Sequence, residues 1–279
     1  MAETTGTARQ ASPAAASELT PPATTAILDP QHWAQIGEDA DDADSDSTLE
    51  PDNASSTASI SSSILEYRTI QGRTYHSEQG NAQYCEIEDC TREWTFKSSF
   101  ADYIHARWLF GSIKSWDDFF AEAFRVCKPG GWVESHEAAS SISSDDNTVA
   151  PDSAMGHWGK FFLEGSKKIG TSFTVVEDGT QRKAMEAAGF INIQEFEFRN
   201  PIGAWPEDPI EKRMGSYTQY GLETDSEGFI LFMAHALGWK REEILVYIAQ
   251  FRREIRSGKH HGYFAQKVVW GQKPKTTTS

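Results

Sequence analysis

Residues 116–136 read WDDFFAEAFRVCKPGGWVESH, and this stretch decides the fold. Its first part predicts a helix over Trp116–Cys127, with Ser115 as the N-cap, because apolar residues recur there at helical spacing. These apolar residues are Phe119, Phe120, Ala123, Phe124 and Cys127. The Pro-Gly-Gly run at 129–131 ends the helix with turn chemistry, and Trp132–His136 reads as a strand. A helix, a tight turn and a strand form one unit of an α/β domain.

Strands and helices alternate on both sides of this unit. The other predicted strands are Ala101–Ala106, Ile191–Phe198 and Tyr263–Trp270. The other predicted helices are Asp152–Lys168, Asp178–Ala188, Pro209–Tyr220, Glu227–Leu237 and Arg241–Arg256. The strand that begins at Ile191 is expected to be half-buried, with a bulge where its alternation slips at Gln194–Glu195. Such alternation indicates an α/β layered domain around a mainly parallel sheet.

The N-terminal stretch has a different composition from the rest of the 279 residues. Residues 1–63 are rich in Ala, Ser, Thr and Pro, and they contain 11 acidic residues against Arg9 alone. They therefore carry −10 of the formal net charge of −15. Such a segment buries too little apolar surface to offset the entropy of ordering, so we predict a disordered tail. A partner-binding or phosphorylatable arm is the alternative, at Asp39–Ser47 and Ser55–Ser63.

Composition excludes several classes of function. With 41 acidic and 26 basic side chains, direct nucleic-acid binding is not expected. No run of 18 apolar residues is present, so no membrane span is expected. The three cysteines, Cys85, Cys90 and Cys127, are too few for a disulfide framework and fit a reducing compartment. Neither they nor His260–His261 have zinc-ligand spacing, so no metal site is predicted. The expected location is intracellular, in the nucleus, the cytoplasm or both.

The central stretch and its neighbours resemble one family. The run FRVCKPGGWVE at Phe124–Glu134 resembles the entry to the fifth strand of class I S-adenosylmethionine-dependent methyltransferases. Further segments are similar to the fungal secondary-metabolism regulators of the velvet-complex type and to their trans-aconitate-methyltransferase-like relatives. They are GRTYHSEQGNAQY (Gly72–Tyr84, the N-terminal lid), EIEDCTREWTF (Glu86–Phe96, the third strand), DYIHARWLFGSIKSW (Asp102–Trp116, the fourth strand) and HHGYFAQKVVWGQKP (His260–Pro274).

The resemblance covers nearly all of residues 64–274, with 275–279 as a short disordered end. It implies a Rossmann-like methyltransferase sheet and methyl transfer from S-adenosylmethionine to a protein or small-molecule acceptor. The family, however, places a strand, a Gly-rich turn, a helix and a second strand between the lid and the third strand. Here Tyr84 runs directly into Cys85, and no G-x-G occurs between Ile64 and Asp118.

This internal truncation removes the part of the fold that holds the donor. The missing first strand normally lies next to the fourth, and the cofactor crevice lies where the strand order reverses between them. We therefore predict a sheet that is incomplete at its cofactor-binding half, with impaired S-adenosylmethionine binding. One edge of Ala101–Ala106 is left bare, which is an aggregation hazard. The Tyr84–Glu88 segment could pair with that edge if the connection up to Phe100 is long enough for a parallel crossover.

Four residues carry the site predictions, all of them by resemblance. Asp89 matches the acidic residue that accepts a hydrogen bond from the adenine amino group, and Cys90 follows it. His105 and Arg107 lie at the end of the fourth strand, where the family lines the cofactor and acceptor pocket. His105 is the candidate for a catalytic base, although a half-buried histidine bonded to backbone is the interpretation we favour.

Two further interpretations stay open beside that of an enzyme. The chain could be a non-catalytic interaction protein whose acidic arm and C-terminal half, Pro151–Trp270, dock a regulatory protein partner of the family. It could also be a poorly folded fragment that arises from splicing or from an imperfect gene model, because losing a central strand pair can exceed the stability of a domain. Glu134 and Glu137 could be read as an acid–base pair, but methyl transfer needs none, so we interpret them as structural.

Overall fold

The computed structural model describes residues 27–38, 68–70, 73–75 and 90–275. In chain order the elements are α1 (Pro30–Glu38), β1 (Arg68–Ile70), β2 (Arg73–Tyr75), β3 (Ala101–Arg107), α2 (Trp116–Val126), β4 (Cys127–Ser143), α3 (Ala154–Ile169), α4 (Thr180–Ala188), β5 (Ile191–Pro201), α5 (Pro209–Thr224), α6 (Ser226–Ala236), α7 (Arg241–Arg256) and β6 (Tyr263–Gln272). Each helix predicted between residues 116 and 256 is confirmed within a few residues, and α7 at both ends. Asp89 and the hypothetical pairing of Tyr84–Glu88 fall outside the described residues.

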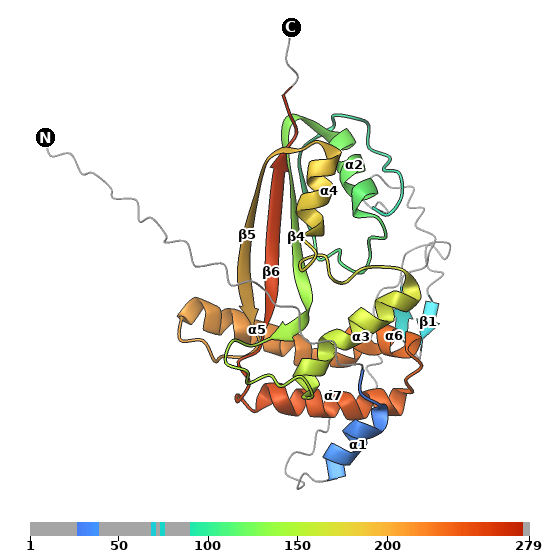
Figure 1. Ribbon diagram of the computed structural model, residues 1–279, viewed down its shortest axis with the longest axis vertical. Coiled ribbons are helices and arrows are strands. Elements are labelled where there is room, and N and C mark those ends of the chain that lie inside the picture. The colour runs from blue at the N-terminus through green and yellow to red at the C-terminus, as the bar shows by residue number, and fades with distance from the viewer. Residues whose placement is uncertain (1–26, 39–67, 71–72, 76–89, 276–279) are drawn as a thin grey trace, which may run out of the picture.

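The α/β class is confirmed, but the prediction of a mainly parallel sheet is wrong. The main sheet has the order β3-β4-β6-β5. β3 and β4 run parallel, whereas β6 is antiparallel to both of its neighbours. The reason is topological: the last residue of β5, Pro201, lies opposite Tyr263, the first residue of β6. The helices between them return the chain to the sheet end where β5 stopped, so β6 runs back between β4 and β5 (Figure 1).

The predicted helix–turn–strand unit is present, with an irregular turn. Ser115 Oγ accepts a hydrogen bond from the backbone N–H of Asp118 at 3.2 Å, which satisfies one of the free donors at the start of α2. Ala101 pairs with Cys127 and Tyr103 pairs with Trp132, so residues 128–131 bulge out of the ladder. β4 then continues beyond the predicted end at His136, because its far half pairs with β6.

The first of two apolar cores lies between the sheet and the helix pair α2 and α4, which pack side by side on one face (Figure 1). Phe120 and Ala123 of α2, Val133 of β4 and Val269 of β6 are fully buried in it. Lys273, just past β6, connects the C-terminal end of α2 to the end of the sheet through hydrogen bonds. Its ammonium donates to the carbonyl oxygens of Phe124 and Cys127, at 2.6 and 2.8 Å, where α2 leaves carbonyls unpaired.

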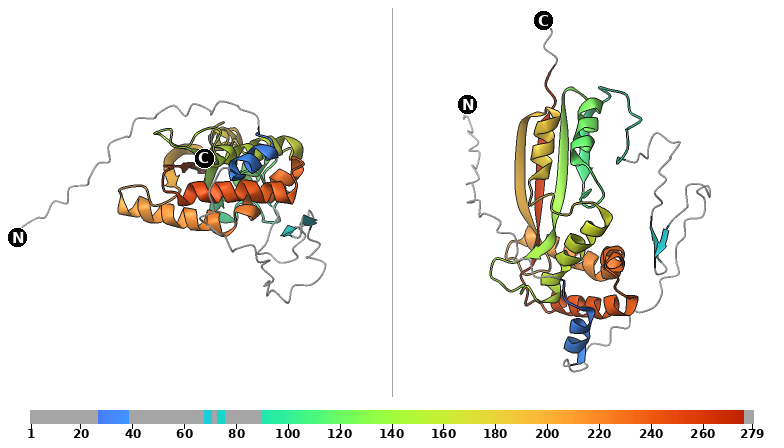
Figure 2. Two further views of the ribbon diagram at one scale, coloured as in Figure 1. Left: turned by 90° about the horizontal axis from the view of Figure 1, so that it is seen from below. Right: turned by 45° about the vertical axis from the view of Figure 1, so that its right-hand side comes forward.

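The second core lies at the other end of the molecule, where α3, α6 and α7 pack together (Figures 1 and 2). Phe161, Tyr247 and Phe251 have no exposed surface there, and the Trp158 ring stacks on Phe251 at 4.4 Å between centroids. The Tyr247 hydroxyl donates to the carbonyl of Ala154 at 2.8 Å, so this buried polar group is satisfied.

Helix α1 corrects the predicted domain boundary. It lies inside residues 1–63, which were predicted to form a disordered tail, yet it packs against α7 (Figure 1). Trp33 is 1% exposed, and its ring contacts His157 and Tyr247 edge-on, at 5.1 Å in each case. The composition of the whole stretch concealed a short apolar set, Ile27, Leu28 and Trp33.

Strand β5 is more exposed than the predicted half-buried strand. It lies at one edge of the described sheet, with β3 at the other, and Phe196 is 58% exposed. A bulge is present, but at Asn192–Ile193 rather than at Gln194–Glu195: Ile191 pairs with Gln272 and Gln194 with Trp270. The backbone of Asn192 has a φ of 54°, a conformation that asparagine tolerates better than most residues.

Candidate functional site

One face of the sheet holds the described site residues that were predicted on β3. Side chains alternate along a strand, so Ile104 and Ala106 face the core under α2. Tyr103, His105 and Arg107 therefore face the opposite side, where Tyr103 is 54% exposed. We call this side the open face.

His105 has a carboxylate partner. Its Nδ1 lies 2.9 Å from Oε1 of Glu134, which is directly opposite on β4. The interpretation of a histidine satisfied by backbone is therefore wrong, because a neighbouring side chain provides the bond. The His105 and Glu134 side chains are 43% and 30% exposed. The role of His105 as a catalytic base stays a prediction.

Arg107 leads into a hollow at the far end of the open face. The hollow has a volume of about 460 Å³. It is formed by the C-terminal end of β3, by the middle of β4, by β5 and β6, and by helix α5. Its lining residues are Arg107, Trp108, His136, Phe198, Asn200, Ile210, Arg213, Met214, Tyr217, Thr218 and Gln266. The predictions included only Arg107. The sequence signal for the part of the lining that α5 contributes is the helical spacing of Ile210, Met214 and Tyr217, which places them on one face of that helix.

Helix α5 is fixed against the sheet by close packing at one point. A Cβ on Gly215 would lie 2.0 Å from the carbonyl oxygen of Gly203, so only glycine allows this approach. The Gly203 N–H donates to the Gly215 carbonyl at 2.9 Å, and the Thr218 hydroxyl donates to Oδ1 of Asn200 at 2.8 Å. These contacts hold the helix while Ile210 and Tyr217 stay exposed at the hollow.

His136 sits in the hollow in its neutral form. Burial, the largest effect, lowers its pKa, although the hydrogen bond with Gln266 opposes the shift. The nearby Arg107 lowers the pKa further. The ring Nε2 lies 2.9 Å from Oε1 of Gln266, a residue that is almost fully buried. His136 is therefore a fixed polar group rather than a third positive charge.

Glu134 and Glu137 do not form a carboxylate pair. They are three residues apart on β4, so they point to opposite faces of the sheet. Glu137 is fully buried, and its Oε2 accepts a hydrogen bond from the Phe110 N–H at 2.9 Å. Burial raises its pKa to about 7, against the opposing effect of the backbone N–H donors of Phe110 and Leu109. Its contacts fit the structural interpretation.

The structure does not bring Cys90 to His105 and Arg107. Cys90 packs at the margin of the core under α2, and its carbonyl accepts a hydrogen bond from Nε1 of Trp94 at 3.3 Å. His105 and Arg107 are on the opposite side of β3. Asp89 lies outside the described residues. The grouping of these four residues around one cofactor stays a prediction.

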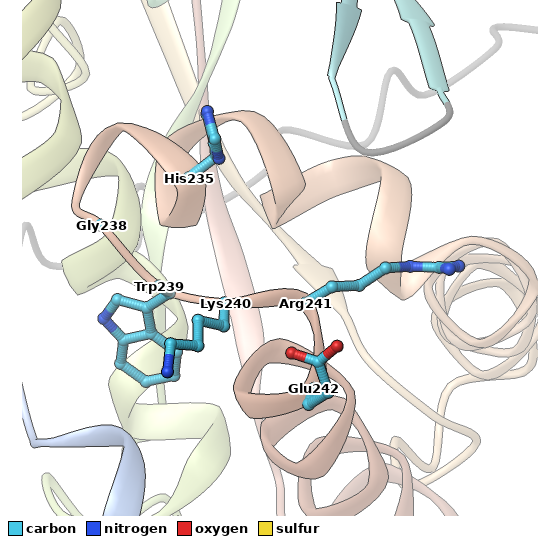
Figure 3. A pocket seen from close by; sticks show the side chains of 6 residues that line it. All are labelled: His235, Gly238, Trp239, Lys240, Arg241 and Glu242. Carbon is cyan, nitrogen blue, oxygen red and sulfur yellow. The ribbon is translucent and has the colours of Figure 1, made fainter.

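A second hollow, of about 450 Å³, lies at the turn between α6 and α7. Figure 3 shows that His235 and Arg241 leave this turn in different directions. Arg241 is bound to Glu227 at 2.9 Å, and the Lys240 N–H donates to Glu243 at 2.7 Å. None of the predicted site residues lines it.

No group of three or more His, Cys, Asp or Glu side chains could hold a metal ion in the part of the chain that the structure describes. No described helix is long and apolar enough to cross a membrane.

The described residues do not fit S-adenosylmethionine, the donor that the resemblance implies. Such a nucleotide-like group needs the crevice at the outer edge of β3, where a neighbouring strand diverges. Among the described strands only β4 pairs with β3. On the open face, His105 is engaged with Glu134, and Arg107 lies over the Trp108 ring at 5.3 Å. No described Gly-rich turn faces either residue.

Comparison with known proteins gives consistent matches. A family model described as a methyltransferase domain matches residues 20–195. Methyltransferase pytC of Aspergillus terreus is 31% identical over 67% of this chain and 57% of its own length. Probable methyltransferase tdiE of Emericella nidulans is 28% identical over 68% and 59%, respectively. Secondary metabolism regulator LAE1 of Cochliobolus heterostrophus is 28% identical over 70% and 64%.

The chain matches only part of each relative. The chain spans between about 57% and 64% of the length of the three relatives named above. A solved structure, phosphoethanolamine N-methyltransferase 2 of Haemonchus contortus in complex with S-adenosyl-L-methionine, is similar with a TM-score of 0.36 and 17% identity. That similarity covers 67% of this chain and 36% of the other.

Proposed function

This chain belongs to the methyltransferase-domain family, and from that premise we propose that it is a relative of the fungal secondary-metabolism regulators whose own binding of S-adenosylmethionine is weak or lost. The family match supports the first part of the proposal. The outer edge of β3 supports the second.

The main support for weak or lost binding of S-adenosylmethionine is the direction of the backbone N–H groups along β3. Phe100 and Trp108 flank the strand, and they donate their N–H groups to the carbonyls of Val126, the last residue of α2, at 2.7 Å and of His136 in the middle of β4 at 2.9 Å. Successive N–H groups of an extended strand point to opposite edges, so those of Tyr103, His105 and Arg107 point away from β4. No described strand receives them. A donor crevice at this edge would require such a strand.

Isothermal titration of the full chain with S-adenosylmethionine tests this proposal. We expect no saturable heat below about 1 mM ligand, which corresponds to a binding free energy weaker than about −4 kcal/mol. A dissociation constant in the micromolar range would contradict it. A cooperative thermal transition of the same sample is the control, because it separates a folded chain without a donor site from a chain that has not folded.

A second candidate function is that of a non-catalytic regulatory protein that docks a velvet-type partner. The exposed aromatic side chains of the open face favour it: Tyr103 and Phe196 are each more than half exposed. Exposed apolar groups that gather on one face are typical of interaction sites. Several relatives are named secondary metabolism regulators, which agrees with such a role.

A pull-down with a velvet-type protein tests the second candidate. The full chain is compared with the double variant Tyr103→Ser/Phe196→Ser and with a chain that lacks residues 1–26. The truncation leaves α1 in place, whereas removal of residues 1–63 would also remove the buried Trp33. Retention by the full chain and loss in the double variant are expected. Equal retention of both would contradict docking through the open face.

A further inference from the structure

We propose that the hollow between α5 and the open face binds a small planar organic anion, of the aromatic carboxylate class. The proposal does not depend on donor binding, so it extends beyond the proposed function. It rests on two arginines without carboxylate partners, on the aromatic walls between them, and on a strained tryptophan at the rim.

The two arginines are unusual for this chain. The formal net charge is −15, and five of the described arginines form ion pairs with carboxylates. Such pairs are formed by Arg125, Arg182, Arg199, Arg241 and Arg256. Arg107 and Arg213 both line the hollow, and neither forms an ion pair with a described residue. No Asp or Glu lines the hollow, and Glu134 beside it is engaged with His105.

This arrangement favours an anion. A guanidinium presents parallel N–H donors that match the two oxygens of a carboxylate. His136 is neutral and held by Gln266, so it adds a polar contact without a further charge. A cation would meet two positive charges in the hollow and no compensating carboxylate.

The walls of the hollow favour a planar ligand. Trp108, Phe198 and Tyr217 line it, and the Arg107 guanidinium already lies over the Trp108 ring, 5.3 Å from its centroid. Aromatic rings and guanidinium planes stack on flat groups. A volume of about 460 Å³ lies within the range of small-molecule sites.

Trp108 adopts a backbone conformation that has a cost. Its φ is 56°, in the left-handed region that bulky residues avoid. Its N–H donates to the His136 carbonyl at 2.9 Å, which holds the bend. The side chain is 47% exposed, so burial of the ring does not offset the strain. Strained residues of this kind cluster at ligand sites, and here the bend places the indole at the rim.

The test uses 2-naphthoate as the probe and the neutral 2-naphthamide as its matched control, each titrated into the full chain by calorimetry without S-adenosylmethionine. Arg107→Gln and Arg213→Gln remove one charge each. We expect 2-naphthoate to bind, and each variant to weaken it about five- to tenfold, as for a partly exposed charge-assisted hydrogen bond. Arg253→Gln, on the exposed side of α7, is the control substitution and should leave the affinity unchanged.

Three results would overturn the proposal: no binding of 2-naphthoate, equal affinity for the carboxylate and the amide, or equal affinity in the two arginine variants and the unsubstituted chain. Far-UV circular dichroism of each variant shows that the fold is kept. Because the donor is absent from the experiment, failure here is separate from failure of the proposed function.

Discussion

At the residue scale, Glu137 is a buried carboxyl group whose ionisation opposes folding. Its pKa rises to about 7 in the folded chain from an ordinary value near 4.5 because burial disfavours the charged form. A group with a raised folded pKa contributes stability that is complete below the unfolded pKa. That contribution falls as the pH rises from about 4.5 and is lost once it passes about 7.

The substitution Glu137→Gln should remove this pH dependence. The amide keeps the size of the carboxylic acid and an oxygen that can accept from the Phe110 N–H. We expect the variant to match the unsubstituted chain at pH 5 and to exceed its free energy of unfolding at pH 8 by roughly 3 kcal/mol. Urea unfolding at both pH values measures this. Glu207→Gln, at an exposed position, is the control. The assignment would be contradicted if the difference in free energy of unfolding between Glu137→Gln and the unsubstituted chain were the same at both pH values.

The site residues were only partly predictable at this scale. His105 and Arg107 could be placed at the end of β3 because the motif around them is specific. The carboxylate partner of His105 comes from β4 and depends on the strand register, which no local pattern contains. Arg213 and Tyr217 join Arg107 only because α5 packs across the sheet, so the hollow is a product of tertiary structure.

At the element scale, α1 shows where composition is misleading. The charge and polarity of residues 1–63 predict disorder, but a segment of about a dozen residues can dock if it brings a large apolar anchor. Leu28 donates its backbone N–H to Nε2 of His157 at 3.2 Å, beside the buried Trp33. Burial lowers the pKa of His157 to about 3, so the ring stays neutral and can accept this bond.

Truncation of the anchor tests whether α1 belongs to the domain. We expect Trp33→Ala to lower the free energy of unfolding by about 3–5 kcal/mol, as for other buried tryptophans. Ile36→Ala on the same helix is the matched control, because Ile36 is 39% exposed and should cost little. Denaturant unfolding of both variants gives the comparison. Equal, small losses would mean that α1 does not pack as described.

The other elements followed from periodicity to different degrees. The helical stripe of α7 predicted both of its ends because its apolar positions are regular and its neighbours are polar. β5 was harder, since an edge strand with one face exposed has a weak pattern and a bulge that shifts it. The direction of β6 could not be read from its own residues. It depends on where three preceding helices return the chain.

At the scale of the whole molecule, the described residues form a layered α/β sheet in which no described strand covers the outer edge of β3. The sequence predicted this from the missing Gly-rich turn and from the direct join of Tyr84 to Cys85. Of the predicted third strand, Glu86–Phe96, residues 86–89 fall outside the described residues, and residues 90–96 form turns and bends rather than a strand. The central claim is that β3 is the edge of the sheet, because a donor crevice depends on a further strand there.

Hydrogen exchange along β3 tests that claim most directly. If β3 is the edge, the amides of Tyr103, His105 and Arg107 exchange rapidly, whereas those of Ile104 and Ala106, which point to β4, exchange slowly. Amides of β6, which has a strand on each side, serve as the internal reference for protection. Protection of Tyr103, His105 and Arg107 equal to that of β6 would contradict the account, since it would mean that another strand covers the outer edge of β3.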